Sequence, residues 1–252
     1  MGFDLTGKTV IVTGNSTGLG KSIGLTMGKL GASVPVNFYH NESRADKALE
    51  EYQSAGIRSF KIQADVTSES GVDHLVSETE RQIGNVDIVV LNATCDQPLK
   101  TIEDYDWETY QAMLDFFVKS PFLVTRRVLA NMKEQKWGRI INITSEVFHK
   151  AVSPFSAYVA AKGAQVGWSR SMSQELAPFG ITVNMVAPGW IPVERHEKDP
   201  QEMKDGYLKT IPMQRWGTPD DVAHACCYLG SHQSNFVTGQ TIAVNGGNSA
   251  WM

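Results

Sequence analysis

Short β-branched runs alternate with longer amphipathic runs along almost the whole chain. Strands are expected at Thr9–Thr13, Ser33–Phe38, Ser59–Gln63, Val86–Leu91, Arg139–Ile143, Thr182–Val186 and Thr241–Val244. Runs with helical periodicity separate them: Leu19–Leu30, Arg44–Ala55, Ser70–Ile83, Trp107–Lys133, Ala157–Ala177 and Pro219–Leu229. Strands as apolar as Val86–Leu91 suit a sheet that helices cover on both faces. The alternation therefore predicts one α/β domain over residues 1–252, with a doubly wound parallel sheet of about seven strands.

Composition excludes several classes of function. The net charge of -4 argues against a nucleic-acid partner, which would require a basic face. No apolar run is long enough to cross a bilayer, so no membrane partner is expected. Three cysteines, two of them adjacent, form no disulfide framework, which predicts a cytoplasmic protein. The six histidines are scattered, so no metal site is expected.

A glycine-rich turn joins the first expected strand to the first expected helix. Glycines in such a turn let the backbone approach a pyrophosphate, which then caps the helix. The spacing is G-x-x-x-G-x-G, and its place at the start of an alternating chain predicts a Rossmann-type dinucleotide site. The expected cofactor contacts here are Gly14, Ser16, Thr17, Gly18, Leu19 and Gly20.

Two further strand ends support the same site. Asp65 and Val66 end the third strand, where a carboxylate could accept a hydrogen bond from an adenine amino group. An acid that stabilises the next helix N-terminus is an equally good interpretation of Asp65. Asn92 and Ala93 end the fourth strand and should face the crevice where the strand order reverses.

Tyr158 and Lys162 are four residues apart in an expected helix, so both side chains should project from one face. An ammonium beside a phenol favours the phenolate, so we expect the pKa of Tyr158 to fall below its free value of about 10. That would make Tyr158 a general acid or base near neutral pH. Ser145, which follows a strand, could hold the same substrate oxygen; a simple turn serine is the alternative.

In order and spacing, these motifs resemble the short-chain dehydrogenase/reductase family over essentially the whole chain. The matching positions are Thr13–Gly20, Asp65-Val66, Asn92-Ala93, Ser145, Tyr158, Lys162 and Pro188-Gly189. Within the family the chain is most similar to glucose 1-dehydrogenases and 3-oxoacyl-carrier-protein reductases, through Ile211–Met213, Trp216–Ala223 and Val237–Gln240.

The resemblance implies an NAD(P)-dependent oxidoreductase that interconverts a carbonyl and a secondary alcohol. It assigns proton transfer to Tyr158, carbonyl orientation to Ser145, and ribose binding with lowering of the tyrosine pKa to Lys162. It also implies cofactor contacts at Pro188, Gly189 and Ile191, and a homotetramer.

Three positions depart from the family pattern. Phe117 stands where the family has a helix asparagine that helps hold a water linked to the lysine, so we expect the proton relay to be altered or supplied by another group. Thr94 replaces a glycine. Val193 replaces the threonine that contacts the cofactor carboxamide, so nicotinamide placement should rely on backbone such as that of Ile191.

Cofactor choice depends on the end of the second strand. An NAD enzyme usually has an acid there, whereas this chain has Phe38. Without a carboxylate, a 2′-phosphate is not repelled, and Asn37, Ser16, His40 or Arg44 could contact it. Thr17 stands where strongly NADP-selective members often have an arginine. We therefore favour NADP, with NAD as the alternative.

A long irregular segment at about 188–212 is expected to be a substrate lid, with a solvated connector as the alternative. The expected substrate contacts are Glu146, His149, Trp190 and Glu194, with Arg195, Tyr207 and Cys95 to Gln97 as further candidates. Such a pocket fits a polar sugar-like or oxo-acid substrate, unless these charges pair on the surface. The alternatives are a 3-oxoacyl thioester reductase and a catalytically weak nucleotide-binding sensor; the intact Ser145, Tyr158 and Lys162 weigh against the sensor.

Overall fold

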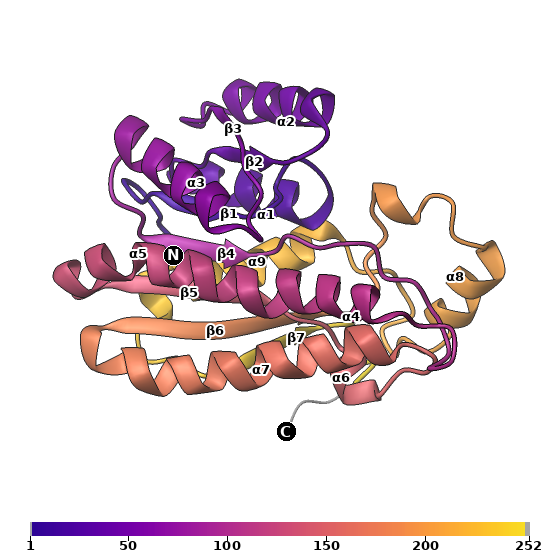
Figure 1. Cartoon of the computed structure of the whole chain (residues 1–252). Helices are drawn as coiled ribbons and strands as arrows, with labels where there is room; N and C mark the ends of the chain where they lie inside the picture. Colours follow the sequence, from indigo (N-terminus) through magenta and orange to yellow (C-terminus); the bar gives the residue numbers. More distant parts are fainter. Residues whose placement is uncertain (1, 250–252) are drawn as a thin grey trace.

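The computed structural model describes residues 2–249 and confirms the α/β prediction. The strands are β1 Val10–Val12, β2 Val36–Phe38, β3 Lys61–Gln63, β4 Ile88–Leu91, β5 Gly138–Ile143, β6 Ile181–Pro188 and β7 Thr241–Val244. The α-helices are α1 Gly18–Lys29, α2 Glu42–Ser54, α3 Glu69–Gln82, α4 Trp107–Leu114, α5 Ser120–Gln135, α6 Val147–Lys150, α7 Ser156–Leu176, α8 Gln201–Leu208 and α9 Pro219–Gly230. Figure 1 shows the strands between layers of helices.

The strands form two parallel sheets rather than the single sheet that the sequence predicts. One has the order β1-β4-β5-β6-β7 and the other pairs β2 with β3. A single parallel bridge from Thr9 to Ser33 joins them. Pro35 explains the break, because it has no N–H to donate to β1 where the next ladder bond would form. The Asn15 side chain donates to the Pro35 carbonyl instead, at 2.9 Å.

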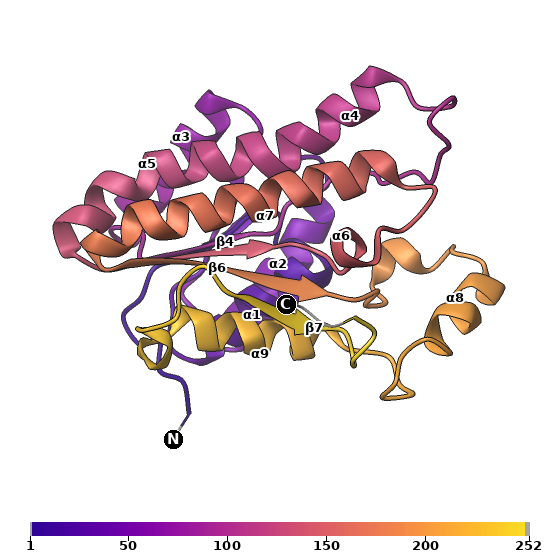
Figure 2. The same ribbon diagram turned by 90° about the horizontal axis from the view of Figure 1, so that it is seen from below.

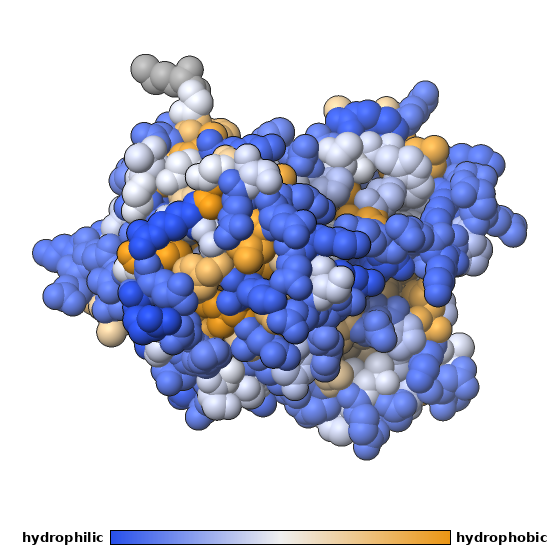
Figure 3. Space-filling model, turned by 90° about the horizontal axis from the view of Figure 1, so that it is seen from above, coloured by the Kyte–Doolittle hydropathy of each residue, from blue (hydrophilic) through white to orange (hydrophobic). Residues whose placement is uncertain are grey.

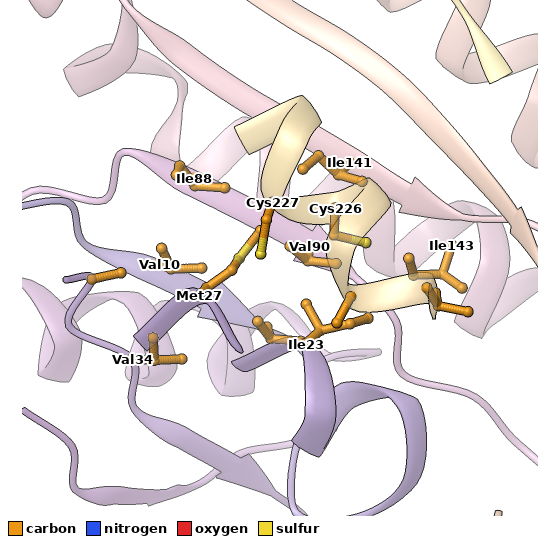
Figure 4. Packing of buried hydrophobic residues seen from close by; sticks show 14 of the residues in the cluster. Val10, Ile23, Met27, Val34, Ile88, Val90, Ile141, Ile143, Cys226 and Cys227 are labelled. Atoms are coloured by element: carbon orange, nitrogen blue, oxygen red, sulfur yellow. The ribbon is translucent and has the colours of Figure 1, made fainter. Parts of the chain in front are cut away.

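Each face of the larger sheet carries its own hydrophobic cluster. One cluster packs α1, α2 and α9 against the sheet, and the other packs α3, α5 and α7 against the opposite face. In Figure 4, side chains of the first cluster meet in one layer: Val10, Ile23, Met27, Val34, Ile88, Val90, Ile141, Ile143, Cys226 and Cys227. The outer side of α2 and α3, seen from above in Figure 3, is mostly hydrophilic.

The long helix expected at Trp107–Lys133 is interrupted. A π-helical turn at Asp115–Lys119 separates α4 from α5, and the Ser120 N–H donates to the Asp115 carbonyl. Pro121 follows at once and can neither donate to Phe117 nor avoid its carbonyl in a regular helix. The wider turn relieves that conflict and presents Phe117 to the interior.

The segment at 188–212 is more ordered than the irregular lid that the sequence predicts. It holds a 3₁₀ turn at Glu194–His196 and the helix α8, which projects from the side of the molecule in Figures 1 and 2. Across residues 2–249, no helix combines the length and hydrophobicity needed to span a membrane.

Candidate active site

The turn between β1 and α1 requires glycine at the three positions that the sequence singled out. Gly14 and Gly18 have φ values of +66° and +58°, which side chains rarely adopt. A Cβ on Gly20 would lie 2.5 Å from Nδ2 of Asn92 and 2.6 Å from the Gly14 carbonyl. The backbone is therefore as close-packed as a nucleotide-binding turn needs to be.

Two buried asparagines hold this turn in place. The Gly14 N–H donates to Oδ1 of Asn37 at 2.8 Å, and the Asn37 N–H donates to Oδ1 of Asn15 at 2.6 Å. Nδ2 of Asn37 donates to the Ala64 carbonyl at 3.2 Å. The Asn37 side chain is buried, and both its oxygen and its nitrogen bond inside the protein, so the structure does not present it to a 2′-phosphate.

The end of β4 lies directly beside the turn, where the strand order predicts it. Nδ2 of Asn92 donates to the carbonyl of Thr13 at 3.0 Å and to that of Gly14 at 3.3 Å. The backbone N–H groups of Asn92 and Ala93 both donate to Oγ1 of Thr13, at 2.9 and 3.0 Å. Asn92 therefore fixes the relation between β4 and the glycine turn.

Asp65 stabilises a local turn rather than a helix end. Its Oδ1 accepts from both the N–H and the hydroxyl of Thr67, at 2.9 and 2.7 Å. Ser68 is the residue that caps α3, through a bond from the Gly71 N–H. The side chain of Val66 is buried beside this turn.

Tyr158 and Lys162 lie one turn apart on α7, and both are buried, at 7% and 3% exposure. Nζ of Lys162 donates to the Ile143 carbonyl at 2.7 Å and to Oε1 of Gln165 at 3.0 Å. It lies 5.5 Å from the centre of the Tyr158 ring. Because an ammonium has three donors, these bonds leave one for a ligand.

The electrostatics of this pair differ from the prediction. Burial raises the pKa of Tyr158 above its ordinary value, and the charge of Arg195 with a hydrogen bond from Ser145 only partly offsets it. Burial also lowers the pKa of Lys162 well below its ordinary value. The expected fall in the tyrosine pKa is therefore wrong, because loss of solvent disfavours the charged form of each group.

Phe117 lies between the two catalytic candidates. Its ring meets that of Tyr158 edge to face, with centroids 5.4 Å apart, and Nζ of Lys162 lies 3.7 Å from its centre. An aromatic face at that distance attracts a cation. The ring thus occupies space beside the lysine that a polar side chain and a water would otherwise share.

Ser145 lies close to Tyr158, as expected. A hydrogen bond from its side chain lowers the pKa of the phenol, and its Oγ also accepts from the Val147 N–H at 3.3 Å. The structure therefore brings Ser145, Tyr158 and Lys162 together at the carboxyl end of β5.

Glu146 is hydrogen-bonded to the 188–212 segment. Its Oε1 accepts from the Tyr207 hydroxyl at 2.6 Å and from Nδ2 of Asn248 at 3.1 Å. The Tyr207 hydroxyl in turn accepts from the Trp190 N–H at 2.7 Å. This chain ties the segment to the residue that follows Ser145.

An aromatic cluster surrounds that chain of hydrogen bonds. Trp190 meets Tyr207, Trp216 and His196 edge to face, with centroids 5.4 to 5.8 Å apart. Tyr207 stacks on Trp216.

His149 lies in α6, and burial lowers its pKa.

Glu194 lies at the nucleotide turn and not beside the other expected substrate contacts. Its Oε2 accepts from the Gly18 N–H at 3.1 Å. The expectation that it lines the substrate pocket is therefore not what the structure shows.

Pro188, Gly189 and Ile191 lead from β6 into the segment. The Pro188 carbonyl accepts from the Glu146 N–H, and the Gly189 N–H donates to Val244. The Ile191 side chain is buried in the first hydrophobic cluster.

Sequence reasoning missed a chain of buried hydrogen bonds that holds the amine of Lys162. Gln165 accepts from Nζ and donates to Oδ1 of Asn142 at 3.1 Å, and Asn142 donates to Ser169. The spacing of Lys162 and Gln165, three apart on a helix, is a signal that could have found the first link.

Comparisons with known proteins agree with this geometry. The sequence model of the family described as enoyl-(acyl-carrier-protein) reductase matches residues 13–249. The crystal structure of a short-chain type dehydrogenase/reductase from Mycobacterium marinum matches with a TM-score of 0.89 and 30% identity, over 99% of this chain and 98% of that one. The chain belongs to the short-chain dehydrogenase/reductase family. It is therefore an oxidoreductase, and members of this family use nicotinamide cofactors.

Two relatives show the range of chemistry within that family. A 3-oxoacyl-(acyl-carrier-protein) reductase from Staphylococcus epidermidis is 36% identical over 95% of this chain and 98% of its own length. A 2-dehydro-3-deoxy-D-gluconate 5-dehydrogenase from Formosa agariphila is 33% identical over 97% of this chain and 94% of its own. Within residues 2–249, no group of three or more histidine, cysteine or acidic side chains could hold a metal ion.

Proposed function

We propose that the chain interconverts a carbonyl and a secondary alcohol on a polar sugar-like or oxo-acid substrate, with NADP(H) favoured over NAD(H). One observation carries the proposal. The hydroxyls of Ser145 and Tyr158 lie close together at the carboxyl end of β5, on the sheet edge that also bears the glycine turn. Ligands of doubly wound sheets bind at this edge.

The turn supports a dinucleotide because its glycines leave room for the backbone to approach a diphosphate. Gly14, Ser16, Thr17, Gly18, Leu19 and Gly20 would form that seat. Asp65 would accept from the adenine beside Val66 and Phe38, and Asn92, Ala93, Pro188, Gly189 and the backbone of Ile191 would line the nicotinamide end.

The chain's own residues would manage the substrate oxygen. The Tyr158 hydroxyl gives its proton to the carbonyl oxygen, and the Ser145 hydroxyl donates a hydrogen bond to the same oxygen. Lys162 uses its remaining donor to hold the ribose. When bound, the nicotinamide supplies the hydride for reduction or accepts it in the reverse reaction.

The preference for NADP rests on the absence of an acid at Phe38, and the use of Asn37 in the turn leaves Ser16, His40 and Arg44 as phosphate contacts. Michaelis constants for NADPH and NADH test it directly. We expect the lower constant for NADPH; a strong preference for NADH would overturn this part of the proposal.

The substrate class rests on polar and aromatic groups of α6 and the 188–212 segment, namely His149 and Trp190. A panel of sugars, sugar acids, diketones and acetoacetyl thioesters, followed by the absorbance of NADPH, tests it. We expect turnover with sugar-like or oxo-acid substrates. Turnover with the thioesters alone would favour the activity named for the Staphylococcus relative, and tight cofactor binding without any turnover would favour a sensor.

We further propose a cytoplasmic homotetramer in which each chain is one domain. The partly exposed Phe122 and Trp107 on α5 and α4 support subunit contacts there. The free thiols Cys95, Cys226 and Cys227 support a reducing compartment. Sedimentation would show four chains per particle, and a monomer would contradict the assembly.

A further inference from the structure

The tip of the 188–212 segment, residues 193–199, contacts the glycine turn directly. Oε2 of Glu194 accepts a hydrogen bond of 3.1 Å from the Gly18 N–H, although the two residues are 176 positions apart. A Cβ built on Gly18 would lie 3.6 Å from Cγ2 of Val193 and 3.8 Å from the Glu194 carboxylate. The contact is therefore one of packing as well as of charge.

Gly18 is the first residue of α1, so its N–H has no partner within the helix. Thr17 makes no side-chain bond at this helix end, and the first turn of α1 carries no acidic residue. The aligned peptide dipoles favour an anion here. Within residues 2–249, the Glu194 carboxylate is the anion that hydrogen-bonds to this N–H.

We propose that Glu194 is a displaceable substitute for the cofactor's diphosphate, and that it sets how tightly the dinucleotide binds. This inference rests on the proposed function, in which the diphosphate takes the same helix terminus. One N–H cannot serve both anions at full strength, and two like charges so close repel each other. The tip must therefore leave Gly18 when the cofactor binds.

The rest of the segment can stay in place while the tip moves. Trp190 is held through Tyr207 to the buried Glu146, and its ring packs against Trp216. Glu194 itself is exposed and lies in a single 3₁₀ turn. A short displacement of 193–199 would be enough to free the Gly18 N–H.

A second glutamate, Glu197, directly follows the 3₁₀ turn and allows a matched experiment. Glu194→Gln removes the charge that meets Gly18, and Glu197→Gln removes the same charge from an exposed side chain that makes no bond to the glycine turn. We expect calorimetry to show NADPH binding to Glu194→Gln with a dissociation constant about two- to fivefold lower than in the wild type, the usual effect of an anion at an exposed helix end. Glu197→Gln should match the wild type.

A second readout needs no cofactor. In the free protein, Glu194→Ala should speed tryptic cleavage after Arg195, because the tip is no longer held to Gly18, and Glu197→Ala should not. Equal NADPH affinities in wild type, Glu194→Gln and Glu197→Gln, with equal cleavage rates, would overturn this inference alone. Failure of the wild type to bind NADPH would overturn the proposed function and this inference together.

Discussion

Tyr158 and Lys162 show how burial acts on a candidate catalytic pair at the scale of single residues. Both side chains are removed from water, which stabilises the neutral form of each relative to its charged form. The sequence spacing predicts only that an amine lies near a phenol. The spacing does not show how far solvent is excluded from the site. Solvent is excluded by Phe117, Ala157 and Ala161, which pack in the same buried cluster as Tyr158.

This has a direct consequence for the pH dependence of ketone reduction. Reduction needs the protonated phenol as proton donor, and burial keeps it protonated to a pH at or above its ordinary pKa of 10.0. We expect kcat/KM for reduction to stay level through neutral pH and fall only near pH 10 or higher. A profile that already falls between about pH 7 and 8 would show that Lys162 lowers the phenol pKa after all.

Phe117 offers a second test at the same scale. We expect Phe117→Asn to give a higher kcat than Phe117→Leu, because the amide and a water beside it can link Lys162 to solvent. Both variants should lose about 1–3 kcal/mol in free energy of unfolding, since each removes part of a buried ring. Equal kcat values in the two variants would show that an asparagine at position 117 does not restore a proton relay to Lys162.

At the scale of elements, the strands were predictable and the interruptions were not. Each expected strand is present because buried β-branched runs leave a clear periodicity. The expected helix at Trp107–Lys133 is broken because Pro121 forces a π-helical turn. That proline was visible in the sequence, so this error could have been avoided; the helix α6 at Val147–Lys150 is too short to leave a pattern.

The anchor between Tyr207 and Glu146 makes a prediction for the 188–212 segment. Tyr207→Phe keeps the ring on Trp216. It leaves the Trp190 N–H without its partner and removes one of the two hydrogen bonds to the buried Glu146, whose bond from Asn248 remains. We expect a loss of about 1–3 kcal/mol in free energy of unfolding and faster hydrogen exchange at 190–208.

Tyr39→Phe is the matched control. Its hydroxyl makes no hydrogen bond within the described residues and its side chain is exposed. Denaturant unfolding of both variants gives the comparison. If Tyr207→Phe were no less stable than Tyr39→Phe, the segment would not be anchored through that hydroxyl.

At the scale of the whole molecule, side chains join the two sheets at the point where backbone hydrogen bonds between β1 and β2 are missing. Asn15 and Asn37 bridge β1 and β2 and support the glycine turn at the same time. Contacts of this kind join segments far apart in the chain, as does the bond from Gly18 to Glu194. Sequence motifs predict the candidate catalytic residues, but such long-range partners carry no local pattern from which to predict them.

Asn37→Ala tests that junction. It leaves the Gly14 N–H and the Ala64 carbonyl unpaired in the interior, so we expect a loss of about 1–3 kcal/mol for each group and weaker NADPH binding. Asn85→Ala, at a site where the bond is exposed, should change the free energy of unfolding by less than about 0.5 kcal/mol. Similar urea unfolding curves for the two variants would contradict this role for Asn37.

The most direct test of proton transfer by Tyr158 is Tyr158→Phe, measured for NADPH binding and for carbonyl reduction in the same preparation. We expect NADPH to bind with nearly the wild-type affinity while reduction slows by about a hundredfold or more, because the proton donor is lost and the ring remains. Reduction at the wild-type rate in this variant would contradict that role.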